Sequence, residues 1–91
     1  MSDRHPKPEE LFDFPCDHVF KAMGPNTELF VFEVSRAVSG ILPVSQDAVK
    51  VRPSGKGNYV SVSVVVRVHN FDQVTGVYDA LRQIDDLKYL L

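Results

Sequence analysis

The sequence predicts an α+β fold in which a four-stranded antiparallel sheet carries two helices on one face. Between Tyr59 and Val68 every even position is valine and the odd positions are mostly polar, which is typical of a strand with one buried face. A glycine-containing turn joins this segment to a second alternating strand before it. Two further segments, one after Thr27 and one after Asn70, have the apolar spacing of amphipathic helices.

A first strand is predicted over residues 16–23, with a less regular alternation. One side carries Cys16, His18, Phe20 and Ala22, and the other carries Asp17, Val19, Lys21 and Met23. Gly24 and Pro25 are predicted to break the strand. The apolar stretch before it, from Leu11 to Pro15, is expected to pack under the core.

The first helix is predicted to open at Thr27 and Glu28, to run to about Ser39, and to end at Gly40. Its apolar side chains lie along one stripe, which comprises Phe30, Val34, Ala37, Val38 and Ile41.

The strand register of the hairpin between residues 49 and 68 can be assigned from the sequence pattern alone. If Ser54 pairs with Tyr59 across the loop of residues 55–58, four valines share one face, as Val51 opposite Val62 and Val49 opposite Val64. Arg52 then faces Ser61, and Lys50 faces Ser63. A slip of one residue would expose the valines of one strand, so the pattern specifies the register. Pro53 has no N–H and confines its strand to a sheet edge or a strand end.

The second helix is predicted to start with Asn70 as its N-cap and Gln73 three residues later. Its apolar face comprises Val74, Val77, Tyr78, Leu81 and Ile84. Gly76 lowers helix propensity by about 1 kcal/mol relative to alanine, and we expect it to permit close packing against the sheet.

Asp85 and Asp86 are predicted to form a turn before a last strand, in which Leu87, Tyr89 and Leu91 alternate with Lys88. The element order is therefore βαββαβ. Right-handed crossovers in both βαβ halves give the strand order 4-1-3-2 with both helices on one face, which is the ferredoxin-like sandwich.

Length and composition narrow the class of protein. The 91 residues provide one domain, predicted over residues 11–91 after a flexible tail of residues 1–10. The net charge of −2 argues against a general binder of nucleic acid or anionic membranes. Cys16 is the only cysteine, so no internal disulfide can form. No apolar run approaches the roughly 20 residues of a membrane span, and the polar start is no signal peptide, so we expect a cytoplasmic protein.

Several motifs together resemble those of the YbeD-like family of small bacterial proteins. They are Phe14 with Pro15, the run from Lys21 to Gly24, the turn from Pro53 to Tyr59 with Ser61, Val62 and Ser63 after it, and Tyr78, Leu81 and Leu91. The resemblance covers nearly the whole chain from Leu11 onward, with glycine at position 55 where the family commonly has serine. It implies an ACT-like ferredoxin fold and a family of unknown function. An association of its genes with lipoyl-transfer genes has led to the label of lipoate regulatory protein, and the resemblance assigns no functional residue.

Two segments have the composition of small-ligand sites. Backbone N–H groups in the glycine-rich turn could cradle a phosphate, but this turn joins two strands, whereas a phosphate-binding loop leads into a helix. Hairpin chemistry explains its glycines better. The second candidate is the loop of Gly24, Pro25, Asn26 and Thr27, since ACT domains bind small effectors at the equivalent position and a helix N-terminus favours carboxylates. Breaking a strand explains Gly24 and Pro25 equally well.

The helix-free face of the sheet is the third candidate. We expect Lys21, Lys50, Arg52 and Arg67 to project there beside Tyr59, Ser61 and Ser63, forming either a solvated face or a surface for a partner or an anion. The run from Lys56 to Val60 resembles the start of an RNA-recognition signature. Asn58 stands where an aromatic is required for base stacking, so binding of nucleic acid is not expected.

The sequence contains no residue pattern typical of a catalytic site or a metal site. Cys16 and His18 lie about 6.6 Å apart along a strand, with no carboxylate placed to orient them. His5, His18 and His69 show no metal-ligand spacing, and Asp79, Asp85 and Asp86 have ordinary helix-surface and turn roles. We expect no enzyme, no cofactor and no metal.

Two functional hypotheses follow. The first is a regulatory or adaptor module that binds a protein partner through the helix-free sheet face or pairs through a sheet edge, with a homodimer as one form. The alternative is an ACT-type sensor of an amino acid or another carboxylate at the loop of residues 24–27.

Overall fold

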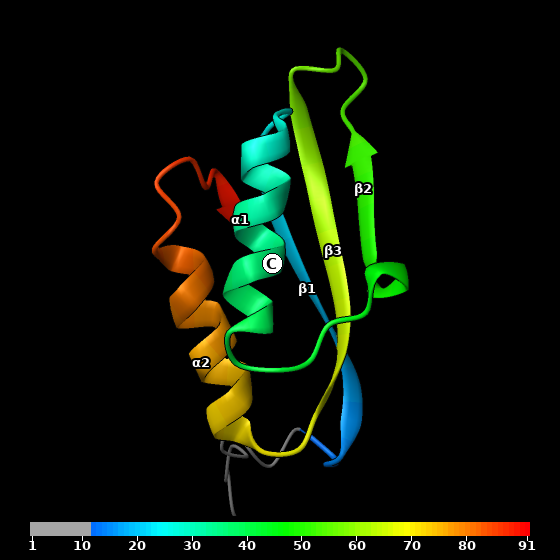
Figure 1. Ribbon diagram of the computed structural model, residues 1–91, viewed down its shortest axis with the longest axis vertical. Coiled ribbons are helices and arrows are strands. Elements are labelled where there is room, and N and C mark those ends of the chain that lie inside the picture. Colours follow the sequence, from blue (N-terminus) through cyan, green and yellow to red (C-terminus); the bar gives the residue numbers. More distant parts are fainter. Residues whose placement is uncertain (1–11) are drawn as a thin grey trace, which may run out of the picture.

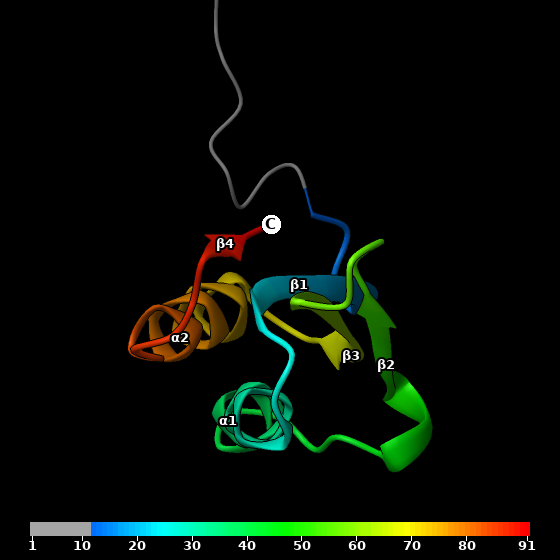
Figure 2. The same cartoon turned by 90° about the horizontal axis from the view of Figure 1, so that it is seen from above.

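The computed structural model describes residues 12–91, and the predicted tail of residues 1–10 lies outside the described residues. The elements are β1 (Cys16–Pro25), α1 (Glu28–Ser39), a single 3-10 turn η2 (Gln46–Ala48), β2 (Val49–Pro53), β3 (Tyr59–Val68), α2 (Phe71–Arg82) and β4 (Tyr89–Leu90). The strands form one antiparallel sheet in the order β2-β3-β1-β4, which is the predicted order read from the other edge (Figure 1). Both helices lie on the same side of this sheet (Figure 2), so the predicted ferredoxin-like arrangement is confirmed.

The predicted hairpin register is confirmed at every position. Val49 pairs with Val64 and Val51 with Val62, while the Ser54 N–H donates to the Tyr59 carbonyl at 2.8 Å. Of the two loop glycines, only Gly57 adopts a positive φ, of 76°. The turn therefore requires glycine at position 57 but not at position 55.

β1 is longer than predicted. Gly24 pairs with Val60 and Pro25 with Tyr59, so the prediction that these two residues break the strand is wrong. Pro25 is tolerated because β4 extends only to Tyr89, opposite Met23, and within residues 12–91 no strand residue needs a donor from position 25.

The helix caps follow the predicted chemistry. The Thr27 hydroxyl accepts a hydrogen bond from the Phe30 N–H at 3.1 Å, and the Asn70 side chain accepts one from the Gln73 N–H at 2.9 Å. The Gln73 side chain accepts in turn from the His69 N–H at 2.8 Å. Each helix therefore begins where its sequence signal predicts.

The core lies between the sheet and the two helices. It contains the even-numbered valines of β3, one row each from α1 and α2, and Phe20 and Ala22 of β1; in full, Phe20, Ala22, Phe30, Val34, Val38, Leu42, Val60, Val62, Val64, Val66, Val68, Val74, Val77, Leu81 and Ile84. Phe12 and Phe14 pack against this core, as expected. Leu42 takes the place predicted for Ile41, which lies after the end of α1 and is 43% exposed.

The expectation for Gly76 is wrong. A Cβ at this position would lie 3.7 Å from Ile41 Cδ1, an ordinary contact, and the sheet is not among its nearest neighbours. The helix therefore does not need a glycine there in order to pack.

Candidate interaction surface

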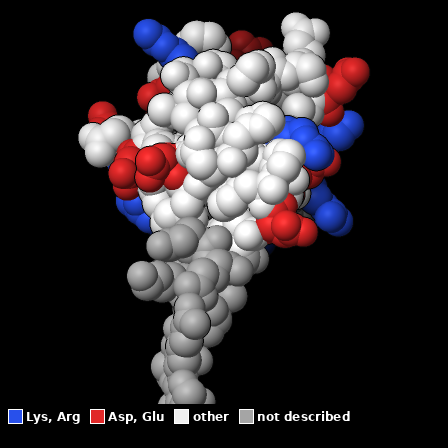
Figure 3. Space-filling model, turned by 90° about the horizontal axis from the view of Figure 1, so that it is seen from below, with Lys and Arg blue, Asp and Glu red and all other residues white. Residues whose placement is uncertain are grey.

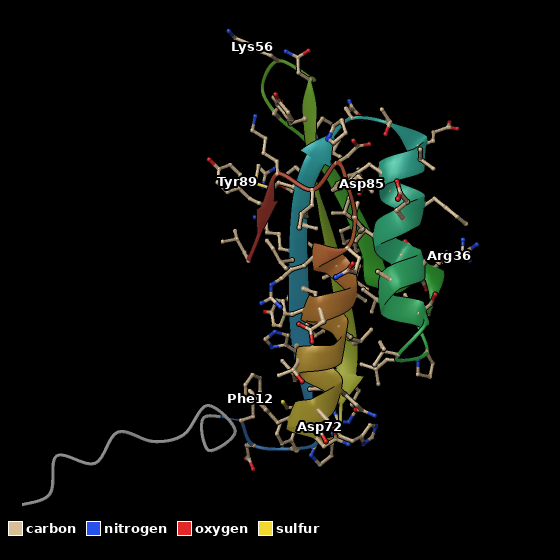
Figure 4. The ribbon with its side chains drawn as sticks, turned by 90° about the vertical axis from the view of Figure 1, so that its left-hand side faces the viewer. Phe12, Arg36, Lys56, Asp72, Asp85 and Tyr89 are labelled. Carbon is tan, nitrogen blue, oxygen red and sulfur yellow. The ribbon has the colours of Figure 1, made fainter. Side chains whose placement is uncertain are left out.

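The face of the sheet opposite the helices, called the open face below, combines alternate residues of all four strands. Strand registers assign to it Asp17, Val19, Lys21, Met23, Lys50, Arg52, Tyr59, Ser61, Ser63, Val65, Arg67, Tyr89 and Leu91. Figure 4 shows Tyr89 directed away from the helices, on the opposite side of the sheet from Arg36 of α1.

The structure brings together the residues that the sequence predicted for this face. Lys21, Ser63 and Lys50 form one row across β1, β3 and β2. In the next row Ser61 lies beside Arg52. Within residues 12–91, neither Lys50 nor Arg52 forms an ion pair. On β2 and β3 these rows are therefore cationic and polar, whereas Tyr89 and Leu91 continue them at β4.

Arg67 differs from the other predicted cations. Its Nη1 lies 3.4 Å from Oδ1 of Asp17, directly opposite on β1, and both side chains are more than half exposed. An ion pair this exposed contributes at most about 1 kcal/mol. Its main effect is to neutralise the end of the open face farthest from the hairpin turn.

The partner surface predicted from the sequence did not include most of the exposed apolar residues of the open face. Val19 is 50% exposed and lies directly opposite Val65, which is 39% exposed. Tyr89 and Leu91, which alternate along the last strand, are 61% and 64% exposed. The alternation of the strands could have identified them, because their odd-numbered side chains point to the face opposite the buried, even-numbered valines.

Lys88 was also missed as a contributor to this surface. Its Nζ lies 3.2 Å from the Tyr59 hydroxyl and 4.5 Å from the centroid of the Tyr59 ring. This is a cation–π geometry, and it places another positive charge beside the aromatic ring. The contact joins residues 29 positions apart, so no local sequence pattern predicts it.

In the predicted ligand loop, the Asn26 donors and the Thr27 hydroxyl form hydrogen bonds within the chain. Asn26 donates from its backbone N–H to the Asn58 carbonyl at 3.1 Å and from Nδ2 to the Gly57 carbonyl at 2.8 Å. The Thr27 hydroxyl caps α1, as described above. These bonds attach the start of α1 to the hairpin turn, whose tip carries Lys56 (Figure 4).

Cys16 and His18 lie on the helix side of β1, where His18 has an aromatic setting. Its Nε2 is 3.0 Å from the Tyr78 hydroxyl, and its ring meets the Phe20 ring edge-on at a centroid distance of 4.6 Å. Burial lowers the pKa of His18 below its ordinary value of 6.5. Within residues 12–91 no group of histidine, cysteine and carboxylate side chains has the arrangement of a metal site. Packing thus accounts for His18.

A groove of about 370 Å³ lies between α1 and the start of β2. Phe32, Ser35, Arg36, Ser39, Val44, Ser45, Gln46 and Val49 line it. Figure 2 explains the space: β2 lies beyond α1, on the side away from α2, so the two helices leave that edge of the sheet uncovered.

Charge is mixed elsewhere on the surface. In the visible part of the end shown in Figure 3, both acidic and basic residues lie around an uncharged middle. This end therefore offers no extended field of one sign to a polyanion or a polycation. None of the helices in residues 12–91 is long and apolar enough to cross a membrane.

Solved structures similar to this one support the fold. The solution structure of protein HP0495 from H. pylori matches with a TM-score of 0.74 at 13% identity, covering 98% of this chain and 90% of that chain. The ACT domain from GTP pyrophosphokinase of Chlorobium tepidum matches with a TM-score of 0.61 at 13% identity, covering 82% and 94%. At these identities the likeness extends to the fold alone, which is ACT-like.

Sequence relatives cover almost the full length. A UPF0250 protein of Idiomarina loihiensis is 37% identical over 91% of this chain and 93% of its own length. A UPF0250 protein of Serratia proteamaculans is 36% identical over 93% and 97%. Residues 9–91 match the model of a protein family of unknown function, DUF493. The YbeD-like resemblance is thereby confirmed, and the chain belongs to the DUF493 family of uncharacterised proteins, whose curated bacterial relatives are named UPF0250.

Proposed function

We propose that this chain is a non-enzymatic regulatory or adaptor module that binds a protein partner through the open face of its sheet. The observation that carries the proposal is the clustering of exposed apolar side chains. Of the nine large hydrophobic side chains exposed within residues 12–91, five lie on the open face: Val19, Tyr59, Val65, Tyr89 and Leu91. Val19 lies opposite Val65, Tyr89 and Leu91 lie together at β4, and polar residues separate them from Tyr59. Exposed apolar groups bordered by polar residues are the usual mark of a protein-binding surface.

The rim favours an acidic partner. Lys50 and Arg52 lie on β2, at one edge of the open face, and Lys21 lies on β1 between Ser63 and Leu91. The Lys88 ammonium lies over the Tyr59 ring. The chain as a whole has a net charge of −2, so this cationic rim is a local feature. Complementary charge increases the rate of association and selects partners more than it adds affinity.

Site-specific photo-crosslinking in a bacterial host tests the proposal. A photoreactive side chain at Val65 or at Tyr89 is expected to capture the same partner. Asp79, exposed on α2, provides the matched control position and should capture nothing comparable. Equal capture from Asp79, or none from either sheet position, contradicts the proposal. A product of twice the chain mass identifies the partner as a second copy.

The alternative is an ACT-type sensor that binds an amino acid or another carboxylate at residues 24–27. Its support is the ACT-like fold. Against it, both the backbone N–H and the side-chain Nδ2 of Asn26 already donate to the hairpin turn, so a ligand that needs these donors would have to displace Asn26. Amide chemical shifts distinguish the two functions: changes confined to residues 23–27 on adding amino acids favour the sensor.

A further inference from the structure

β2 has a free outer edge with a defined hydrogen-bonding pattern. The Ser54 N–H bonds to Tyr59 of β3, and in an antiparallel pair every second residue bonds to the same neighbour. Arg52 and Lys50 therefore direct their backbone groups to β3, while Val51 between them directs its N–H and C=O outward. Within residues 12–91 no strand pairs with this edge.

The side chains along this edge differ between the two faces. Lys50 and Arg52 are exposed on the open face. Val51 points to the helix side but is 45% exposed, because neither helix covers β2. On that side, Phe32 is 58% exposed and lines the groove of about 370 Å³ together with Val49. One face of the edge is thus cationic, and the other presents Val51 and Phe32 beside a groove whose lining also includes Arg36 and polar side chains.

We propose that the β2 edge binds an extended segment of a partner protein in which acidic and apolar residues alternate, so that the segment adds a fifth strand to the sheet. Successive side chains of a strand point to opposite faces. The acidic row then lies beside Lys50 and Arg52, and the apolar row lies beside Val51 and over the groove at Phe32. Main-chain hydrogen bonds to Val51 hold the added strand, and its alternating side chains determine which segments bind.

A second copy fits this edge poorly. Two β2 strands paired about Val51 would place Lys50 of each copy directly opposite Arg52 of the other. Like charges at such cross-strand positions are destabilising. The same cations that oppose self-pairing favour an acidic strand. The inference rests on the proposed function, because it takes Lys50 and Arg52 from the rim of the open face.

Short peptides test the inference. The probes are a seven-residue peptide of alternating glutamate and valine, a peptide of the same composition in two blocks, and an alternating lysine and valine peptide. The alternating acidic peptide is expected to shift the amide signals of residues 49–53 and Phe32 and to slow hydrogen exchange at the Val51 N–H. Equal binding of the block peptide overturns the inference, because charge alone would then suffice.

Two variants sharpen the test. Lys50→Glu with Arg52→Glu is expected to weaken the acidic peptide at least tenfold and to admit the lysine peptide. Val51→Pro removes the outward donor without removing a bond to β3, and it is expected to weaken binding about tenfold while the amide signals of residues 60–68 stay in place. Unchanged binding in both variants overturns the inference, as does a dimer in sedimentation that Val51→Pro dissociates.

Failure of the edge proposal can be distinguished from failure of the open-face proposal. Crosslinks from Val65 and Tyr89 that persist when no peptide binds would leave the open face as a partner surface and reject the edge. Loss of those crosslinks in the Val51→Pro variant would show that the two surfaces hold one partner.

Discussion

The ring of Phe30 fills the space into which a side chain at Gly24 would project. A Cβ at position 24 would lie 2.5 Å from Cζ and 2.8 Å from Cδ1 of Phe30, and the ring itself is fully buried. The glycine is therefore part of the packing between β1 and α1. Its presence needs no ligand to explain it, although it begins the loop that an ACT-type effector would occupy.

Replacing Gly24 by alanine is expected to destabilise the fold by about 1–3 kcal/mol, because the added carbon overpacks the core against Phe30. Urea unfolding measures the change. The double variant with Phe30→Leu should be less destabilised than the sum of the two single changes, since the smaller side chain relieves the clash. Strict additivity would show that the ring already has room to move.

The two glycines of the hairpin turn should respond differently to alanine. Gly57 has a φ of 76°, and a left-handed backbone is unfavourable for alanine by about 1–2 kcal/mol. Gly55 has no positive φ and no neighbouring atom within 4 Å of a Cβ, so Gly55→Ala is the matched control and should change stability by no more than about 0.5 kcal/mol. Similar effects at both positions would contradict this account of the turn.

Gly76→Ala is expected to stabilise the protein by about 0.5–1 kcal/mol. The helix gains propensity, and the new methyl group meets Ile41 at an ordinary contact distance. Thermal unfolding provides the measurement. Ala80→Gly, one turn later in α2, should lower stability by a similar amount. A lower midpoint for Gly76→Ala would mean that the methyl group disturbs the packing of Ile41.

Stability is expected to fall as the pH drops below the ordinary histidine range. The pKa of His18 is lower in the folded protein than the 6.5 of an unburied side chain, so the folded state binds fewer protons than the unfolded chain in this window. The His18 contribution is present above pH 6.5 and is lost as the pH falls through the lowered pKa. Urea midpoints at about pH 7.5 and about pH 5.5 measure the loss. The His18→Gln variant should show a weaker pH dependence of stability, whereas the His69→Gln variant should retain it. An equal pH dependence in both variants and the unchanged protein would show that a group other than His18 causes it.

The alternating strand was predictable from the sequence because its signal is local and repeated. The valines at even positions from 60 to 68 specify the buried face, the register and the neighbouring strand together. The caps of both helices were predictable for the same reason, since Thr27 and Asn70 act on backbone groups three residues away.

Features that depend on distant contacts were not predictable. Gly24 and Pro25 resemble a strand break, but pairing with β3 carries them into the sheet. Lys88 reaches Tyr59 across 29 positions, and Val51 is exposed on the helix side because α1 does not reach it. The alternation of the strands predicted the cationic residues of the open face. Val19 and Val65 were not included in the predicted partner surface, although the same alternation applies to them.

The period-two pattern of β3 also separates two kinds of substitution. Even positions hold the valine layer against the helices, so a substitution there changes folding stability. Odd positions, such as Ser61, Ser63 and Val65, reach only the open face, so substitutions there change the chemistry of that face while the buried layer is kept. The ten residues of β3 thus assign folding stability to one set of side chains and the chemistry of the open face to the other.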